Sequence, residues 1–469
     1  MLTGGDVVLV TIDMVPDLAL IEIFDFYMSE GVNNAPSQYC GEAWIILAHV
    51  CRKWRDIVFG SPYRLNVRLY FPGQRSVRAM LDTWPPFPID IWGSYLRARE
   101  VDNIVAALEH TGRIHTIELS DSSIFHLEPV LAAMQNPFPS LTELAIDFSD
   151  EDSALSDPDS LLSGSAPLLR SLRLRSIRFP LPLLRNILLS TTDLVELRLR
   201  STPDSEFISP EAMVACLFGL NKLEEFELGF RSLRIWRSQH LHPSTRCVLP
   251  ALTSLQFIGS CEYLEDLLAP IDSPLLHTLD VLFHHPELDT PQLAQFVDRT
   301  PKLKALHDAH IRFRDSGVSV SLPGTSPKGL YVEILRVPSP SSVMAQLCHG
   351  TSSYIRTLIP MIKHLYIIDR RLRRLYSFVQ DIADSSQWLD LLGPFIALED
   401  LYLSRELSPH IVPALHKILE EGTVEVLPSL QNLFLERELR YGQLGEAVGQ
   451  LVSALRLSSR PIAVLWWDT

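Results

Sequence analysis

The stretch Leu169-Arg170-Ser171-Leu172-Arg173-Leu174 decides the fold, together with its copy Leu194-Val195-Glu196-Leu197-Arg198-Leu199. Both follow the pattern Leu-x-x-Leu-x-Leu, in which the last two leucines are separated by one polar residue. Alternation with a period of two is typical of a β-strand that buries one of its faces. Each copy therefore predicts a short strand whose leucines point into a core.

The pattern recurs along the chain, with other apolar residues at some of the leucine positions. Copies begin at Ile114, Leu141, Leu169, Leu194, Leu223, Leu252 and Leu276, and late copies begin at Leu398 and Leu430. Subtracting successive starting positions from 114 to 276 gives steps of 27, 28, 25, 29, 29 and 24 residues. A period of this size matches the length of a leucine-rich repeat.

Helix signals lie between the strand-like copies. A hydroxyl side chain followed by proline is a typical helix start, and it occurs at Ser209-Pro210, Thr290-Pro291, Ser339-Pro340 and Ser408-Pro409. One strand and one helix in each unit predict an α/β fold, namely a solenoid with a parallel concave sheet and helices on the convex side. An all-helical array is the alternative, and the alternation of Leu172, Leu174 and Ile177 disfavours it.

Some segments before and within the repeats are less regular. We expect two atypical early strands at residues 64–69 and 88–91. The repeat blurs between residues 302 and 370, where Leu303, Leu306, Ile311 and Phe313 preserve a degraded copy.

Composition distinguishes loops from a final strand. Residues 149–160 are acidic, and residues 315–329 are rich in Ser, Gly and Pro, so we expect both segments to be solvated loops. The apolar run Ile462–Trp467 predicts a last strand that covers the end of the array.

A different pattern occupies residues 15–62. Leu20, Ile23 and Phe24 recur at helical spacing, and so do Leu47, Val50, Cys51, Trp54 and Ile57 further along. The spacing predicts two short amphipathic helices that bury too little surface to be stable alone. They need a partner face, either in this chain or in another protein.

These residues resemble an F-box, with Val15-Pro16 at the start, Ile23-Phe24 in the first helix and the run Val50-Cys51-x-x-Trp54-x-x-Ile57. Leu18 stands where an acidic residue is usual, and an insertion within residues 29–43 lengthens the connection between the helices. The resemblance implies docking on a Skp-type adaptor of a cullin–RING (SCF-type) ubiquitin ligase. The residues implied in that contact are Val15, Pro16, Leu20, Ile23, Phe24, Val50, Cys51, Trp54 and Ile57. The alternative is that these helices are the N-terminal cap of a larger helical domain.

The repeats resemble the irregular leucine-rich repeats that follow F-boxes in substrate adaptors. We therefore divide the chain into an F-box-like helical module (1–62), atypical first repeats or a linker (63–113), and an irregular leucine-rich-repeat solenoid with a C-terminal cap (114–469). The resemblance implies a substrate-recognition adaptor whose solenoid binds a target protein. The alternatives are a leucine-rich interaction scaffold with no ligase role, or a hydrolase or transferase with degenerate motifs.

Charge and composition narrow the classes of partner. A net charge of −15 argues against general nucleic-acid binding, which requires a basic surface. The six cysteines contain no Cys-x-x-Cys pair, which favours a reducing compartment. No run approaches the roughly 20 apolar residues of a membrane span. We expect a soluble protein of the cytoplasm, the nucleus or both, with no membrane partner.

The sequence lacks the motifs of common catalytic sites, including a Gly-x-Ser-x-Gly elbow, a phosphate-binding Gly-x-x-x-x-Gly-Lys-Ser/Thr loop and a His-Glu-x-x-His helix. We therefore expect a non-enzymatic protein with no catalytic residues, no cofactor and no metal site.

One charge pattern suggests where a target binds. Arg173, Arg175, Arg198 and Arg200 occupy positions between or beside the repeat leucines, so they are expected on the concave sheet face. Guanidinium groups bind carboxylates and phosphates in a bidentate manner. The four arginines are therefore candidates for docking an acidic or phosphorylated segment of a substrate. The alternative is that they pair with Glu196, Glu227 or Asp147 on the same sheet.

Overall fold

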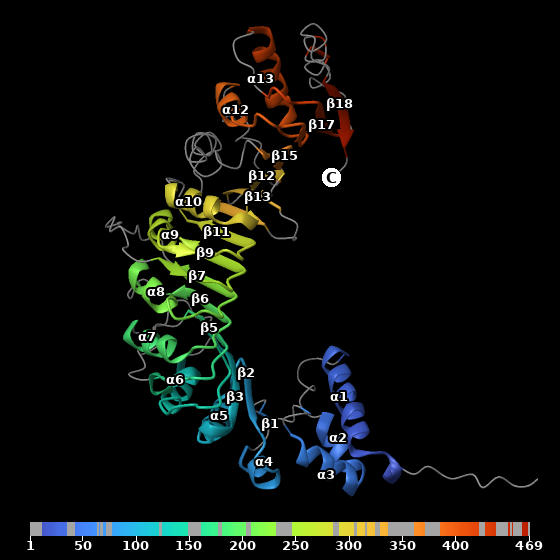
Figure 1. Cartoon of the computed structure of the whole chain (residues 1–469), viewed down its shortest axis with the longest axis vertical. Helices are drawn as coiled ribbons and strands as arrows, with labels where there is room; N and C mark the ends of the chain where they lie inside the picture. The colour runs from blue at the N-terminus through green and yellow to red at the C-terminus, as the bar shows by residue number, and fades with distance from the viewer. Residues whose placement is uncertain are drawn as a thin grey trace, which may run out of the picture. The chain divides into compact units, whose positions relative to one another are not determined.

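The computed structural model describes the following residues: 12–34, 43–62, 65, 69–71, 77–121, 124–148, 161–176, 181–202, 208–230, 246–284, 290–303, 307–314, 317–323, 329–335, 361–370, 385–421, 427–437, 449–450, 453 and 462–467 (Figure 1). The chain divides into two compact units, Met1–Thr191 and Thr192–Thr469. The boundaries predicted at residues 62 and 113 remain predictions.

The first unit begins with three helices, α1 (Asp17–Asn34), α2 (Ala43–Val50) and α3 (Arg52–Gly60). The sequence predicted one continuous second helix through Cys51, and that prediction is wrong. Cys51 has an extended backbone, and its Sγ accepts a hydrogen bond from the Trp54 backbone N–H at 3.5 Å. Cys51 therefore caps α3 and separates it from α2. Asn33 and Asn34, which were expected in a loop, belong to α1.

Five parallel strands follow in the first unit, and they neighbour one another in chain order. They are β1 (Leu69–Phe71), β2 (Ile89–Ser94), β3 (Ile114–Asp121), β4 (Glu143–Phe148) and β5 (Ser171–Arg175). The helices of this region are α4 (Val77–Thr83), α5 (Ala98–Leu108), α6 (Ile124–Ala133) and α7 (Leu181–Ser190). The strand predicted at 88–91 is confirmed, whereas the strand predicted at 64–69 shares only Leu69 with β1.

The register confirms the repeat pattern within the first unit. Ile117, Leu144 and Leu172 align on β3, β4 and β5, and all three side chains are buried. The acidic segment 149–160 lies outside the described residues.

The second unit continues with parallel strands β6 (Glu196–Thr202), β7 (Glu225–Phe230), β9 (Ser254–Gly259) and β11 (Thr278–Phe283). Leu197, Phe226, Leu255 and Leu279 align and are buried. The helices α8 (Pro210–Leu217), α9 (Cys261–Leu268) and α10 (Pro291–Arg299) lie along one side of these strands (Figure 1). Strands β8 (Cys247–Val248) and β10 (Ile271–Asp272) form a separate parallel pair.

Two of the predicted helix starts are confirmed in this region. The Oγ of Ser209 accepts a hydrogen bond from the Ala212 N–H at 3.2 Å and so caps α8. Pro291 begins α10, although Thr290 makes no capping hydrogen bond with its side chain.

The sheet then departs from a purely parallel arrangement. The chain passes from β11 to β12 (Asp308–Arg314), turns back through β13 (Gly317–Leu322) and returns as β14 (Leu330–Leu335), which gives the spatial order β11-β14-β13-β12. Strand β13 is antiparallel to both of its neighbours. The prediction of a solvated loop over 315–329 is therefore wrong for β13, where Val318, Val320 and Leu322 are buried. The serines between these residues give the segment the composition of a loop, whereas its alternating apolar residues form a strand.

Parallel pairing resumes after β12 with β15 (His364–Asp369), β16 (Asp400–Leu403), β17 (Asn432–Glu436) and β18 (Ala463–Trp467). Helices α12 (Ser385–Leu392) and α13 (Ser408–Glu421) belong to this region. The last strand predicted over Ile462–Trp467 is confirmed as β18. The fold is mixed α/β with a large parallel sheet, which excludes the all-helical alternative.

Candidate functional site

One face of the sheet is the candidate functional surface. The apolar residues of each repeat point into the core, and the residues between them point to the opposite face, which we call the open face. In the second unit the strand register aligns these open-face residues into a single row. The row is Arg198, Glu227, Gln256, Asp280, Tyr331, Ser321, His310, Tyr366, Tyr402 and Phe434.

The charged end of this row is compensated by its own carboxylates. Arg198 pairs with Glu196 at 2.6 Å and with Glu225 at 2.7 Å, and Arg200 pairs with Glu227. The side chain of Glu227 is only 3 % exposed. Burial alone would lower the pKa of Arg198, but the hydrogen bond to Glu225 and the nearby carboxylates raise it above its usual value. This end of the open face therefore carries little unbalanced positive charge.

The two candidate arginines of the first unit are paired as well. Arg173 lies 3.8 Å from a Glu143 carboxylate oxygen, and Arg175 lies 3.4 Å from Asp147. These pairs are substantially exposed, and exposed ion pairs contribute little to stability. All four arginines thus have the internal partners that the alternative interpretation required, while their role in substrate binding remains a prediction.

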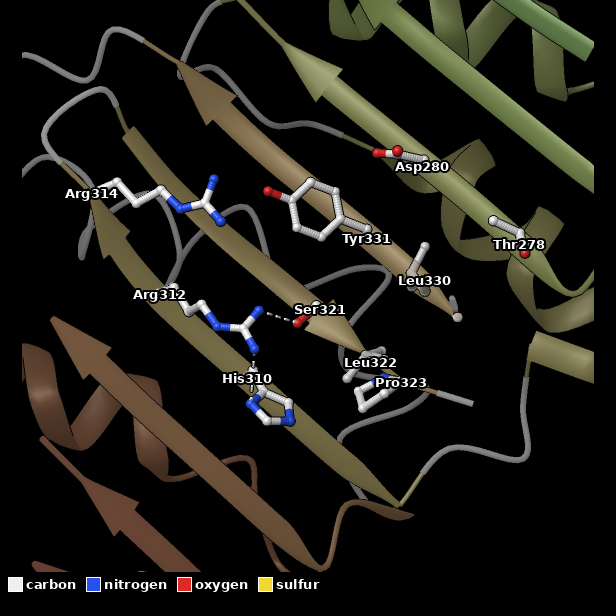
Figure 2. Close-up of a pocket in the computed structure, with 11 residues that line it drawn as sticks. Thr278, Asp280, His310, Arg312, Arg314, Ser321, Leu322, Pro323, Leu330 and Tyr331 are labelled. Atoms are coloured by element: carbon white, nitrogen blue, oxygen red, sulfur yellow. Dashed lines mark hydrogen bonds between the residues drawn. The ribbon is translucent and has the colours of Figure 1, made fainter. Parts of the chain in front are cut away.

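A pocket of about 440 Å³ lies where the antiparallel strand interrupts the sheet (Figure 2). Arg312 and Arg314 of β12, Ser321 of β13 and Tyr331 of β14 extend into it, with Asp280 on the far side. Sequence analysis did not select these residues. The available signal was the burial alternation of Ala309, Ile311 and Phe313, which places His310, Arg312 and Arg314 on the open face.

Arg312 differs from the other arginines in its partners. Its Nη1 donates to Ser321 Oγ at 3.1 Å, and its Nη2 donates to His310 Nδ1 at 3.3 Å. No carboxylate of the described residues forms an ion pair with it, whereas Arg314 lies 3.5 Å from Glu333. Burial lowers the pKa of Arg312, and the neighbouring Arg314 and Arg370 lower it further, although Tyr331 opposes them. Arg312 is thus a half-buried cation among other cations.

His310 is neutral at physiological pH. Burial, with a contribution from Arg312, lowers its pKa to about 4, although Asp308 opposes the shift. A guanidinium only donates hydrogen bonds, so Nδ1 of His310 accepts and the ring proton lies on Nε2. His310 therefore orients Arg312 without adding to the positive charge.

Stacked aromatic rings continue the row beyond the pocket. His310 stacks on Tyr366 at a centroid distance of 4.3 Å, Tyr366 on Tyr402 at 4.1 Å, and Tyr402 on Phe434 at 4.2 Å. We call these four residues the aromatic ladder. Burial, with help from Tyr366, raises the pKa of Tyr402 to about 12, so the hydroxyl of Tyr402 stays protonated. Each ring is partly exposed, so the ladder offers an apolar surface beside Arg312.

The helices of the N-terminal module have their own core, and several of the predicted contact residues belong to it. Leu20, Phe24 and Ile57 are buried, and Trp54 packs against Phe24 with ring centroids 4.8 Å apart. The contact of Phe24 with Trp54 joins α1 to α3, and the role of these residues in binding an adaptor stays a prediction. Cys51 is half-buried as the cap of α3.

Other apolar residues of the module are exposed. Ile23 and Val50, both among the predicted contacts, are 55 % and 56 % exposed. Leu18, Phe26 and Ile46, which sequence analysis did not select, are more exposed still. Pro16 is exposed, while Val15 is half-buried and its carbonyl accepts a hydrogen bond from Lys53 Nζ at 2.8 Å. We call Leu18, Ile23, Phe26, Ile46 and Val50 the exposed apolar set.

An aromatic cluster attaches the helical module to the following segment. Trp44 packs edge-on against Trp84 at 4.9 Å and against Phe87 at 5.4 Å, and Phe59 contacts Phe87 at 5.4 Å. The module is therefore packed against the following segment through Trp44 and Phe59, while the exposed apolar set lies on α1 and α2.

The chemistry of the described residues offers no metal or thiol centre. No group of three or more His, Cys, Asp or Glu side chains among them is arranged to hold a metal ion. The cysteines Cys51, Cys216, Cys247 and Cys261 are free thiols, and burial raises the pKa of Cys247 to about 11. A membrane-spanning helix is also absent from the part of the chain that the structure describes.

Comparison with known proteins gives structural similarity but no match to a family. No protein-family model matches the chain, and no curated protein matches it in sequence. Among solved structures, the chain is similar to the leucine-rich repeat-containing protein LegL7 from Legionella pneumophila, with 14 % identity over 82 % of this chain and 98 % of that chain. The TM-score is 0.27, a level too low to assign a shared fold or function.

Proposed function

We propose that this chain is a non-enzymatic substrate-recognition adaptor of a cullin–RING (SCF-type) ubiquitin ligase. In this role the F-box-like helices dock on a Skp-type adaptor, and the leucine-rich-repeat solenoid binds a target protein in the cytoplasm or the nucleus. The F-box resemblance of residues 15–57 supports the assignment at the level of sequence.

The observation that carries the proposal is the exposed apolar set on α1 and α2. Helix α1 has buried apolar residues on one face and exposed apolar residues on the other. Exposed apolar side chains that gather on one element mark sites of protein interaction. Fully burying a large apolar side chain contributes about 1.5–3 kcal/mol, so a few such residues suffice for a stable contact. Leu18, which replaces the acidic residue usual in an F-box, enlarges this apolar surface.

The mechanism requires no nucleophile in this chain. An adaptor that binds its target and the ligase simultaneously holds a target lysine near the ubiquitin carrier. Tethering of this kind raises the effective concentration of the reacting groups without any new chemistry. The open face of the sheet would present the target.

The test is co-purification of a Skp-type adaptor with the full-length chain. The double variant Ile23→Asp/Val50→Asp places two charges on exposed positions and spares the core of the module. We expect it to lose the adaptor while its thermal unfolding is unchanged. Leu189→Asp is the matched control, because Leu189 is an aliphatic residue of α7 with 57 % exposure, and it should retain the adaptor. Equal recovery of the adaptor by wild type and the double variant would contradict the proposal.

A leucine-rich interaction scaffold with no ligase role is the second candidate. It is favoured by the burial of Ile57 and by the contacts of Trp44 with Trp84 and Phe87, which are the contacts of a cap. If wild-type protein recovers no Skp-type adaptor under any condition but still binds a target, this second candidate is correct.

A further inference from the structure

We infer that the pocket around Arg312 and the aromatic ladder form one two-point binding site for an extended segment of a partner protein. Arg312 would bind an anionic side chain of that segment, and the ladder would bind an aromatic or other large apolar side chain nearby. This inference deepens the proposed function by giving the chemistry of the target, and it rests on that function only for calling the partner a substrate.

The charges around the pocket leave Arg312 without a carboxylate partner among the described residues. The guanidinium groups of Arg314 and Arg370 both act on Arg312, Glu333 pairs with Arg314, and the carboxylate of Asp280 lies on the far side of the pocket. Glu333 also accepts a hydrogen bond from the Tyr331 hydroxyl at 2.6 Å. Arg312 donates only to a hydroxyl and to a neutral imidazole. A half-buried cation without a carboxylate is stabilised when an anion binds it.

The hydrogen-bond donors of the pocket, Arg312 and Ser321, are held in position by their neighbours. Ser321 accepts a hydrogen bond from Arg312, so its own hydroxyl proton is available to a ligand. Figure 2 shows Arg312 and Ser321 side by side on adjacent strands, with the ring of Tyr331 across the pocket. His310 holds the guanidinium from the other side. The guanidinium is thus fixed in place before the anion arrives, which reduces the entropy lost on binding.

The length of the aromatic ladder favours an extended protein segment as the occupant. The ladder runs from the pocket across β12, β15, β16 and β17, and neighbouring strands lie ~4.8 Å apart. It therefore extends ~14 Å from His310 to Phe434, farther than a small anion reaches. The chain carries a net charge of −15, so a local positive site selects an acidic segment against the field of the whole protein.

The same geometry fixes the spacing of the two side chains. Tyr366 and Tyr402 lie one and two strands from β12, and both are in register with His310, two residues before Arg312, so Arg312 is ~8 Å from Tyr366 and ~12 Å from Tyr402 across the sheet. An extended peptide advances ~3.3 Å per residue, and alternate side chains share a face. Two residues of an extended chain span ~7 Å, so an acidic residue and an aromatic residue two positions apart match Arg312 and the nearer ring, Tyr366. The anion is the carboxylate of Asp or Glu, or the phosphate of a phosphorylated residue, and the test distinguishes them.

The experiment measures binding of the full-length chain to biotinylated peptide pools, without any Skp-type adaptor. Each pool has a fixed central residue, a fixed Phe two positions later and degenerate flanking positions. The central residue is Glu, phosphoserine or Gln in three separate pools. We expect the Glu or phosphoserine pool to bind about tenfold more tightly than the Gln pool, since charged hydrogen bonds are worth at least this much. A larger preference for phosphoserine than for Glu identifies a phosphorylated target, and equal preference identifies an acidic one.

Variants assign the preference to the site. Arg312→Gln should abolish the preference for the acidic pools, and Arg312→Lys should retain part of it. Arg198→Gln is the matched control, because Arg198 lies on the same open face but is paired with Glu196 and Glu225, and it should retain the full preference. Tyr402→Ala should weaken the binding of all three pools, because each contains Phe, and leave the difference between the Glu and Gln pools intact. Thermal unfolding of each variant verifies its fold.

Three results would overturn the inference: equal binding of acidic and Gln pools by wild type, an undiminished preference in Arg312→Gln, or an equal loss in Arg198→Gln. Because the Skp-type adaptor is absent from the assay, the peptide site can be confirmed even if the ligase proposal fails, and the reverse also holds.

Discussion

Two regions of the open face occupy the same place in the repeat and differ in how their charges are balanced. Around β6 and β7, Arg198 and Arg200 are surrounded by Glu196, Glu225 and Glu227. Around β12 and β15, Arg312 contacts a serine and a neutral histidine, and stacked aromatic rings lie beside it. The number of arginines therefore does not predict a binding site. The absence of an internal carboxylate partner does, because only an unbalanced cation gains from an external anion.

The two regions are expected to have the same kind of apolar core beneath the open face. Removing a core side chain from either region should cause the largest loss of stability. Leu255 in β9 and Leu401 in β16 are both buried beneath the open face. Leu255→Ala and Leu401→Ala should each lower the free energy of unfolding by about 2–5 kcal/mol, because each leaves a cavity. Denaturant unfolding of the full-length chain measures this. A loss at one position with no loss at the other would show that the regions differ in their cores as well as their faces.

Introducing a carboxylate beside Arg312 should balance its charge, as the glutamates around β6 and β7 balance Arg198 and Arg200. Ser321 is the hydroxyl partner of Arg312, and Ser321→Glu would offer it an internal anion. We expect this variant to bind the acidic peptide pools about tenfold more weakly than wild type, because the site is already occupied. Ser321→Ala is the control and should keep most of the affinity. If Ser321→Glu binds as wild type does, charge compensation is not what separates the two regions.

A smaller effect is expected from the titration of His310, which lies in the second region. The pKa of His310 is about 4 in the folded protein, below its ordinary value of 6.5. Between these values the unfolded chain binds a proton that the folded chain does not, so stability falls as the pH is lowered from 6.5 toward 4. Allowing for partial solvent screening, we expect a loss of about 1–2 kcal/mol.

The measurement compares urea unfolding at pH 7 and pH 4.5 for wild type and His310→Gln. The variant should lose less stability over this interval than wild type does. Identical losses in the two proteins would mean that His310 titrates normally and does not remain neutral beside Arg312.

The strands of the sheet could be predicted from sequence because their signal is local. Burial of alternate leucines, as at Leu144, Leu172 and Leu255, specifies both the strand and its register. The reversal at β13 could not be predicted in this way, because the alternation of Val318, Val320 and Leu322 gives no strand direction. The interruption at Cys51 was missed for a related reason, since helical spacing continues on both sides of a single capping residue.

The candidate site was less accessible to sequence reasoning than the fold. Arg173, Arg175, Arg198 and Arg200 were selected for their density, but their carboxylate partners lie on neighbouring strands or nearby in the same strand. Arg312 could not be selected from sequence, because its partners depend on how β12, β13 and β14 pair. In the folded sheet Arg312 contacts Ser321 and His310, while Glu333 pairs with Arg314. At the N-terminal module, helical spacing predicted that Ile23 and Phe24 share a role, whereas one is exposed and the other is buried.

Hydrogen–deuterium exchange of the full-length chain, with and without the acidic peptide pool, tests the central claim most directly. The account predicts that the bound peptide slows exchange in β12 and β15, over Asp308–Arg314 and His364–Asp369, and leaves β6 and β7 unchanged. Slower exchange over Glu196–Thr202 and Glu225–Phe230, with no change in β12 and β15, would contradict it.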